Sequence, residues 1–146
     1  MEPGVAALYQ NEIRLWARKV RNDRRLAQPD VTISKTSRLC GSRLTLDLIL
    51  ENDRVAGIGW MARACTLGMA STAIVVDAAP GLTLAEIKAV GQQLHRLLAG
   101  EDVTFDARWE ALGLFQAARP FPGRQGSILL PFAAAEAAMS QAPPHS

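Results

Sequence analysis

The sequence predicts an α+β domain, a small antiparallel three-stranded sheet with helices packed on one face. Four leucines alternate strictly between residues 44 and 50, which places them on one side of a strand. The predicted elements run in the order helix, three successive strands, several helices. With 146 residues and 49% apolar side chains, the chain can bury one core. We therefore expect a single domain over residues 1–140 and a disordered tail over residues 141–146.

The first predicted helix covers residues 5–20. Its apolar residues recur at three- and four-residue spacing, which is typical of an amphipathic helix: Leu8, Tyr9, Ile13, Trp16 and Val20. The helix and the residues after it are also rich in basic side chains: Arg14, Arg18, Lys19, Arg21, Arg24 and Arg25. This run is interpreted either as a solvated helix end, where cations are favoured, or as a docking surface for an acidic partner protein.

The three strands follow the first helix. The first covers residues 31–36, and the second contains the alternating leucines. Turn-forming residues at 51–53 lead into a return strand over residues 54–61, so the second and third strands form an antiparallel hairpin. Gly57 and Gly59 in the return strand indicate a bulge or a close approach of another backbone.

The next two predicted helices are separated by a chain break at Pro80-Gly81. Residues 65–76 are apolar and mostly small, which favours a buried helix packed closely on the sheet. Thr83 and Glu86 form a capping box at the start of a helix that runs through Leu97.

The C-terminal part contains two further predicted helices. A short one covers residues 109–118, and an alanine-rich one covers residues 128–139. The prolines and glycine of residues 119–123 predict a rigid connector between them.

Composition excludes several function classes. A net charge of +2, from 16 basic and 14 acidic residues, favours neither a nucleic acid nor a membrane as partner. No run approaches the ~20 apolar residues of a membrane span, and the N-terminus lacks the pattern of a secretion signal. Two cysteines are too few for a disulfide framework. We therefore expect a cytoplasmic protein.

The residues with metal or sulfur chemistry are Cys40 and Cys65, 25 positions apart. Cys40 precedes Gly41 at a predicted exposed turn, where its thiol can project as a ligand. Cys65 stands at a predicted helix N-terminus, where amide dipoles favour the thiolate. Spacing alone leaves open whether the two cysteines are ligands or buried packing residues. His95 is interpreted as a helix-surface or core-edge side chain.

Longer stretches around the cysteines resemble the NifU-type IscU/SufU family. They are Cys40-Gly41 before the leucine strand, Cys65-Thr-Leu-Gly-Met-Ala-Ser-Thr after a glycine-containing strand, Gly81-Leu-Thr-Leu-Ala-Glu86 and Phe121-Pro-Gly-Arg124. The similarity covers about residues 8–139. It implies a scaffold, not an enzyme, that receives persulfide sulfur from a cysteine desulfurase, collects iron and passes clusters to recipient proteins. No phosphate loop, His-Glu-x-x-His helix or serine elbow supports an enzyme.

The resemblance places the cofactor-binding site at Cys40, Cys65 and Ser127, with the two cysteines as metal ligands. Ser127 stands where the family has its third cysteine, and Ser42 replaces the aspartate of its Cys-Gly-Asp turn. Gly126 replaces a histidine of the IscU branch, which favours the SufU branch. Serine is a poor ligand for iron or zinc.

Three interpretations remain open at this point. In the first, the chain is a scaffold for a transient iron–sulfur cluster, [2Fe–2S] by preference, or for zinc, and a homodimer supplies four thiolates from Cys40 and Cys65. In the second, Cys65 accepts persulfide sulfur as in SufE or SufU proteins, without a cluster. In the third, the chain is a degenerate paralogue that docks through its basic first helix.

Overall fold

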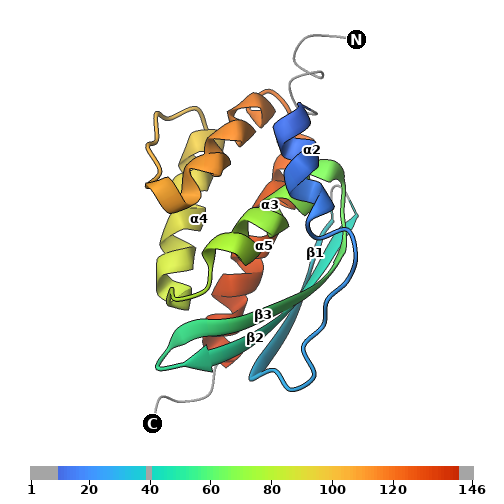
Figure 1. Cartoon of the computed structure of the whole chain (residues 1–146). Coiled ribbons are helices and arrows are strands. Elements are labelled where there is room, and N and C mark those ends of the chain that lie inside the picture. Colours follow the sequence, from blue (N-terminus) through green and yellow to red (C-terminus); the bar gives the residue numbers. More distant parts are fainter. Residues whose placement is uncertain (1–9, 39–40, 142–146) are drawn as a thin grey trace.

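The computed structural model describes residues 10–38 and 41–141 of the chain (Figure 1). Within this part, one antiparallel sheet has the strand order β1 (Val31–Ser37), β2 (Ser42–Glu51) and β3 (Arg54–Arg63). The helices are α2 (Asn11–Arg18), α3 (Thr66–Ala78), α4 (Leu84–Leu98), the 3₁₀ helix η1 (Ala107–Ala118) and α5 (Pro122–Gln141). The α+β class that the sequence predicts is confirmed. Across these described ranges, no helix combines the length and apolar character needed to cross a membrane.

The central strand β2 pairs antiparallel with both neighbours. Three of its alternating leucines are buried on the helical side, as predicted: Leu44, Leu46 and Leu48. Leu50 is only half-buried, at the point where the pairing with β3 shifts register between Ile49 and Leu50. The turn into β3 holds Asn52 and Asp53 at φ angles of 53° and 64°. These are the positive values that a two-residue hairpin turn of type I′ requires.

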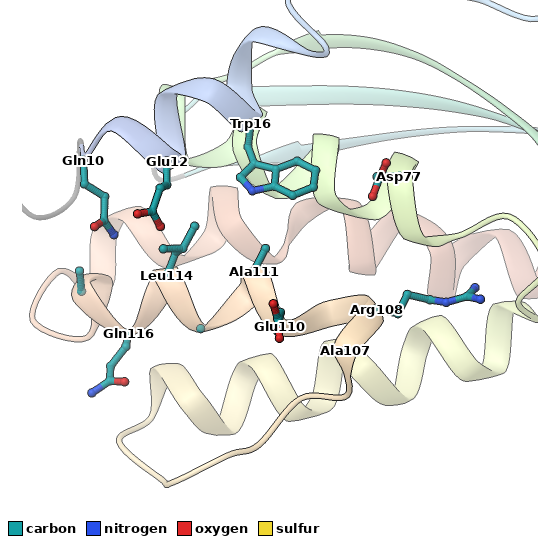
Figure 2. A pocket seen from close by; sticks show the side chains of 12 residues that line it. Gln10, Glu12, Trp16, Asp77, Ala107, Arg108, Glu110, Ala111, Leu114 and Gln116 are labelled. Carbon is teal, nitrogen blue, oxygen red and sulfur yellow. The ribbon is translucent and has the colours of Figure 1, made fainter.

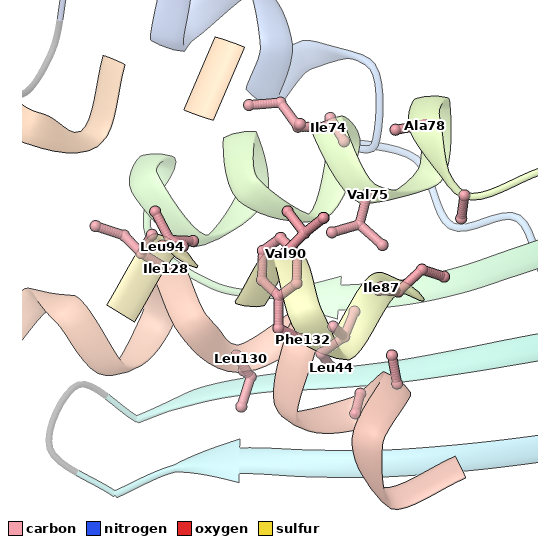
Figure 3. Close-up of a cluster of buried hydrophobic side chains, with 14 of the residues drawn as sticks. Leu44, Ile74, Val75, Ala78, Ile87, Val90, Leu94, Ile128, Leu130 and Phe132 are labelled. Carbon is pink, nitrogen blue, oxygen red and sulfur yellow. The ribbon is translucent and has the colours of Figure 1, made fainter. Parts of the chain in front are cut away.

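Two layers of helices cover one face of the sheet (Figure 1). α3 and α5 lie against the strands, α4 packs on α5, and α2 packs on α3. Figure 3 shows the apolar core between these elements, where Val75 of α3, Val90 of α4 and Phe132 of α5 are buried together. A Cβ atom at Gly91 would lie 2.8 Å from the Cβ of Phe132. The missing side chain of Gly91 therefore permits the close approach of α4 and α5.

The opposite face of the sheet is crossed by the connection between α2 and β1. Arg24 of this connection pairs with Trp60 at the edge of β3, through backbone N–H···O bonds of 2.9 and 2.8 Å. The chain then passes over Gly59, where a Cβ atom would lie 2.5 Å from the carbonyl oxygen of Arg24 and 2.9 Å from the amide nitrogen of Leu26. The close backbone approach predicted for the glycines of β3 is thus confirmed at Gly59.

The carboxylate of Asp47 anchors the same connection to the sheet. Its side chain is fully buried, and it accepts hydrogen bonds from the Arg25 guanidinium (2.7 and 3.1 Å), the Leu26 amide (3.0 Å) and the Thr32 hydroxyl (2.7 Å). Burial by itself raises the pKa of Asp47, but the bonds from Arg25, Thr32 and Leu26 outweigh burial and hold this pKa below its usual value. The carboxylate therefore stays ionised and ties β1, β2 and the crossing segment together.

The first helix is shorter than predicted. α2 ends at Arg18 rather than near residue 20, and residues 1–9, which contain the predicted start, lie outside the described part of the chain. Val20 follows the helix in a turn, yet its side chain is buried. Apolar spacing does not distinguish a helical residue from a buried turn residue, because both face the core. At α4, by contrast, the predicted capping box of Thr83 and Glu86 is confirmed, with bonds of 3.0 and 3.1 Å.

The last two helices differ from the prediction in type and in start. The predicted helix over residues 109–118 is the 3₁₀ helix η1, which begins two residues earlier. The connector predicted over residues 119–123 is wrong in its second half, because α5 begins at Pro122 and not at Ile128. Proline is well accepted in the first turn of a helix, where its missing N–H has no intrahelical partner. Gln141, assigned to the tail, is the last residue of α5, and the rest of the predicted tail lies outside the described residues.

Replacing the central carboxylate should make stability depend less on pH. At pH 7 we expect Asp47→Asn to lower the free energy of unfolding by about 2 kcal/mol, because the buried carboxylate loses its charge-assisted hydrogen bonds from Arg25, Leu26 and Thr32. The lowered pKa of Asp47 contributes stability above the unfolded pKa of about 4, and this contribution is lost as pH falls through the folded pKa. The difference between wild type and variant, measured by urea unfolding, should shrink from pH 7 towards pH 3.

The surface ion pair of Asp23 and Arg63 supplies a matched control. Asp23→Asn also removes a carboxylate with a lowered pKa, but at a surface position where water replaces the partner. A loss as large as that of Asp47→Asn, or a difference for Asp47→Asn that stays constant with pH, would contradict the anchoring role of Asp47.

Candidate functional site

A pair of hydroxyl groups joins the start of β2 to α5. Ser42 is the first residue of β2, and Ser127 lies in the second turn of α5, 85 positions further along the chain. Their Oγ atoms share a hydrogen bond, and both side chains are buried, with 1% and 0% of their surface exposed. The two serines that the sequence analysis singled out therefore contact each other.

Ser127 also lies against the first turn of α3. A Cβ atom at Gly68 would be 2.9 Å from the Ser127 Oγ and 3.0 Å from the Cβ of Ala64. Gly68 is the third residue of α3, so its missing side chain leaves the space that the Ser127 hydroxyl occupies. The start of β2, the second turn of α5 and the first turn of α3 thus meet at one point.

Cys65 is the N-cap residue of α3, as the sequence predicts. Its backbone is extended, with φ −68° and ψ 169°, and its side chain makes no capping hydrogen bond. The residue is half-buried, and its carbonyl accepts the first bond of the helix from Met69, at 2.9 Å. Cys65 precedes Gly68 by three residues, so it stands in the same turn that contacts Ser127. The first amides of a helix carry partial positive charge, which favours an anion at this end.

Arg63, two residues before Cys65 along the chain, is paired with Asp23. Arg63 donates from both terminal nitrogens to the carboxylate of Asp23, at 2.8 Å each. The hydrogen bond from Arg63 lowers the pKa of Asp23, against a smaller opposing effect of burial. The two charged groups therefore bind each other and not the Cys65 thiol. At Cys65 the local electrostatic field comes from the N-terminus of α3.

A second hydroxyl holds α3 to α5 beside the serine pair. The Ser71 Oγ donates to the carbonyl oxygen of Ile128, at 2.5 Å. In the same part of α5, Pro131 has no N–H to donate to the carbonyl four residues earlier. The Ser71 hydroxyl thus bonds the backbone of α5 close to the proline. The relative position of α3 and α5, and with it the site, is fixed by buried polar contacts as well as by packing.

The structure does not place every predicted site residue. Cys40 lies outside the described residues, and the chain resumes at Gly41 with a φ of +67°, a turn conformation. Among residues 10–38 and 41–141, no three His, Cys, Asp or Glu side chains come together in an arrangement that could hold a metal ion. His95 is exposed on α4, as expected, and does not line this region. The donors described here are one thiol and two mutually bonded hydroxyls.

The basic run of the sequence divides into two parts in the structure. The side chain of Arg25 is committed to Asp47, whereas the other basic residues of the run are exposed: Arg14, Arg18, Lys19, Arg21 and Arg24. The ammonium group of Lys19 lies 4.2 Å from the ring centroid of Trp16, a cation–π contact.

Asp47 is a structurally important residue that the sequence analysis did not identify. The signal that could have found it is a charged residue among the alternating leucines of β2.

No protein-family model matches this chain, and no curated protein sequence matches it. Solved protein structures, by contrast, do match this chain. The crystal structure of a nitrogen-fixing NifU-like protein (N-terminal) from Brucella abortus has a TM-score of 0.87 and 27% identity, covering 94% of this chain and 96% of that one. A protein described as an iron–sulfur cluster assembly scaffold for the SUF system, from Fervidobacterium islandicum AW-1, has a TM-score of 0.81 and 17% identity, covering 89% and 95%. The chain therefore has the NifU-like fold, and NifU-like and SufU scaffold proteins are its structural neighbours.

The serine pair should behave as one energetic unit. We expect Ser42→Ala and Ser127→Ala each to lower the free energy of unfolding by about 1–2 kcal/mol, because each removes a partner of a buried hydroxyl. The double variant should lose less than the sum of the two single losses, since it removes both partners together. Ser34→Ala is the comparison variant: it breaks a 2.7 Å hydroxyl pair with the buried Thr45, but Ser34 itself is exposed, so water can replace its hydroxyl and the loss should be smaller. Strictly additive losses in urea unfolding would show that the two hydroxyls are not coupled.

Proposed function

We propose that this protein is a scaffold-type component of iron–sulfur cluster assembly, which receives sulfur from a cysteine desulfurase and holds it with iron at Cys65 and Cys40. The observation that carries the proposal is the position of Cys65, a half-buried thiol at the N-cap of α3, where β2 and α5 also meet. The similarity over 94% of the chain to a NifU-like structure supports the same role.

The serine pair restricts which residues hold the cargo. A hydroxyl ligand for iron must be accessible and must compete with thiolate, which is the softer and stronger donor. The Ser42 and Ser127 hydroxyls are buried and bonded to each other. We therefore assign both serines a structural role, and each chain then supplies two thiolates. A [2Fe–2S] cluster held by four cysteines requires two chains, so we propose a transient homodimer around the cluster.

Sulfur arrives by a step that is neutral in electrons. The Cys65 thiolate attacks the outer sulfur of the persulfide on the desulfurase, the sulfur–sulfur bond breaks, and the desulfurase cysteine leaves as a thiolate. Cys65 then carries the persulfide. The α3 N-terminus favours the attacking thiolate electrostatically, because the first amides of the helix point towards the cap residue. Recipient proteins would take the finished cluster by exchanging their own ligands for Cys40 and Cys65.

A second function is favoured by one observation at the same site. Cys65 stands half-buried at the N-cap of α3 without a side-chain capping bond, and one such thiol suffices to accept sulfur, whereas a cluster needs four ligands. In this case Cys65 relays persulfide sulfur to another protein and no cluster forms on the chain. The docking-only interpretation, through the exposed basic residues of α2, needs neither cysteine and is distinguished by replacing both.

Anaerobic reconstitution tests the scaffold function. The purified chain is incubated with ferrous iron, cysteine, a desulfurase and dithiothreitol, which supplies the electrons that reduce persulfide sulfur to sulfide. Visible absorption, iron and acid-labile sulfide are then measured. We expect a coloured product with about one iron and one sulfide per chain, which doubles in mass on size-exclusion chromatography. Cys65→Ser and Cys40→Ser should each abolish the colour, and Ser127→Ala should retain it. A colourless wild type, with colour only in a Ser127→Cys variant, would contradict cluster holding by the native chain.

Mass spectrometry tests the sulfur-acceptor function. After incubation with a desulfurase and cysteine in the absence of iron, the intact chain should gain the mass of one sulfur atom on Cys65. The gain should disappear in Cys65→Ser and persist in Cys40→Ser, which serves as the matched thiol control. A gain confined to Cys40, or unchanged mass in the wild type, would exclude Cys65 as the acceptor.

A further inference from the structure

A groove of about 1010 Å³ runs between α2 and η1 (Figure 2). Its apolar surface comes from Trp16 of α2 and from Ala111, Leu114 and Ala117 of η1. None of Cys65, Ser42 and Ser127 lines it, so it does not belong to the proposed sulfur site. In Figure 2 the ring of Trp16 faces the helix that carries Leu114 and Ala111.

Three carboxylates surround this apolar surface. Glu12 belongs to α2, Asp77 to the end of α3 and Glu110 to η1, and all three are exposed. The cation in the lining is Arg108, whose guanidinium already donates to the carbonyl oxygens of Ala78 and Pro80, at 3.1 and 3.2 Å. The groove therefore combines an apolar floor with an acidic rim.

The outer side of α2 extends the apolar surface. Leu15 is 56% exposed, and a second hollow of about 400 Å³ lies between it, Glu12, Trp16 and Lys19. The two hollows share Glu12 and Trp16. Leu15 therefore continues the apolar surface of the groove past Trp16.

The chemistry of the groove defines its occupant. An amphipathic helix binds by laying apolar side chains into a hydrophobic groove, at three- and four-residue spacing, while its polar face contacts the rim. The rim here is anionic, and complementary charge favours a cationic segment over an anionic one. We infer that the α2–η1 groove is a docking site for a basic amphipathic helix of a partner protein, with apolar side chains on Trp16 and Leu114 and basic side chains near Glu12, Asp77 and Glu110.

Fluorescence of Trp16 provides a direct readout. The chain has three tryptophans, and Trp60 and Trp109 are buried, at 7% and 2% exposure, whereas Trp16 is partly exposed in the groove. The full chain is titrated with a synthetic helical peptide that has leucines on one face and lysines on the other. We expect a blue shift of the tryptophan emission, saturation, and weaker binding at high salt. Trp16→Phe should remove the spectral shift, while calorimetry still detects binding.

Charge variants separate the groove from non-specific attraction. Neutralising the rim with Glu12→Gln, Asp77→Asn and Glu110→Gln should weaken peptide binding about tenfold, because three exposed charge pairs each make a small contribution to binding. The matched control neutralises three exposed carboxylates elsewhere, with Glu51→Gln, Glu101→Gln and Asp102→Asn, and should bind as the wild type does. All six residues are exposed, so the variants should fold, which circular dichroism checks.

Four results would overturn the inference. The first is equal binding of a peptide in which glutamate replaces every lysine, and the second is unchanged binding by the rim variant. The third is a Trp16 emission that depends on protein concentration without peptide, which would make a second copy of the chain the occupant. The fourth is a Trp16 emission that changes when residues 1–9 are deleted, which would assign the groove to that segment.

Discussion

The buried carboxylate of Asp47 is the interaction on which the arrangement of this protein depends. A charge in the centre of a sheet is costly unless donors surround it, and Arg25, Leu26 and Thr32 supply these donors. The bonds hold the α2–β1 connection across one face of the sheet, while Leu44, Leu46 and Leu48 of β2 are buried on the other face, where the helices pack. The helices, and with them the meeting point of α3, α5 and β2, lie on the face that this connection leaves open.

At this meeting point, two serines that are far apart in sequence form one structural unit. Ser42 and Ser127 lie 85 positions apart, and together they make a buried hydroxyl pair. Such a pair satisfies its own polar atoms and joins β2 to α5 without a metal ion. Cys65 differs from both serines, because it stays half-buried at the helix N-terminus without a capping bond. This contrast is why the proposed chemistry is assigned to thiols alone.

Much of the fold was predictable, because it rests on local patterns. The alternation of Leu44, Leu46 and Leu48 is a property of one strand, and the Thr83–Glu86 capping box is contained within four residues. The errors occurred where local patterns are ambiguous. The Pro122-Gly123 pair is compatible with a turn and with a helix start, and apolar spacing continues through Val20 although the helix has ended. Tertiary packing decides such cases, since either conformation buries the same side chains.

Sequence alone determined the α+β class, the order of its strands and helices, the N-terminal position of Cys65 on a helix and the resemblance to NifU-type proteins. Those properties follow from residues that are close in the chain or from motifs with fixed spacing. Only the tertiary structure decided that Ser42 bonds Ser127, that Asp47 holds the crossing segment, and that α2 and η1 enclose an acidic groove. Each of these joins residues at least 21 positions apart. No periodicity specifies such pairs, because their proximity depends on how complete helices and strands pack.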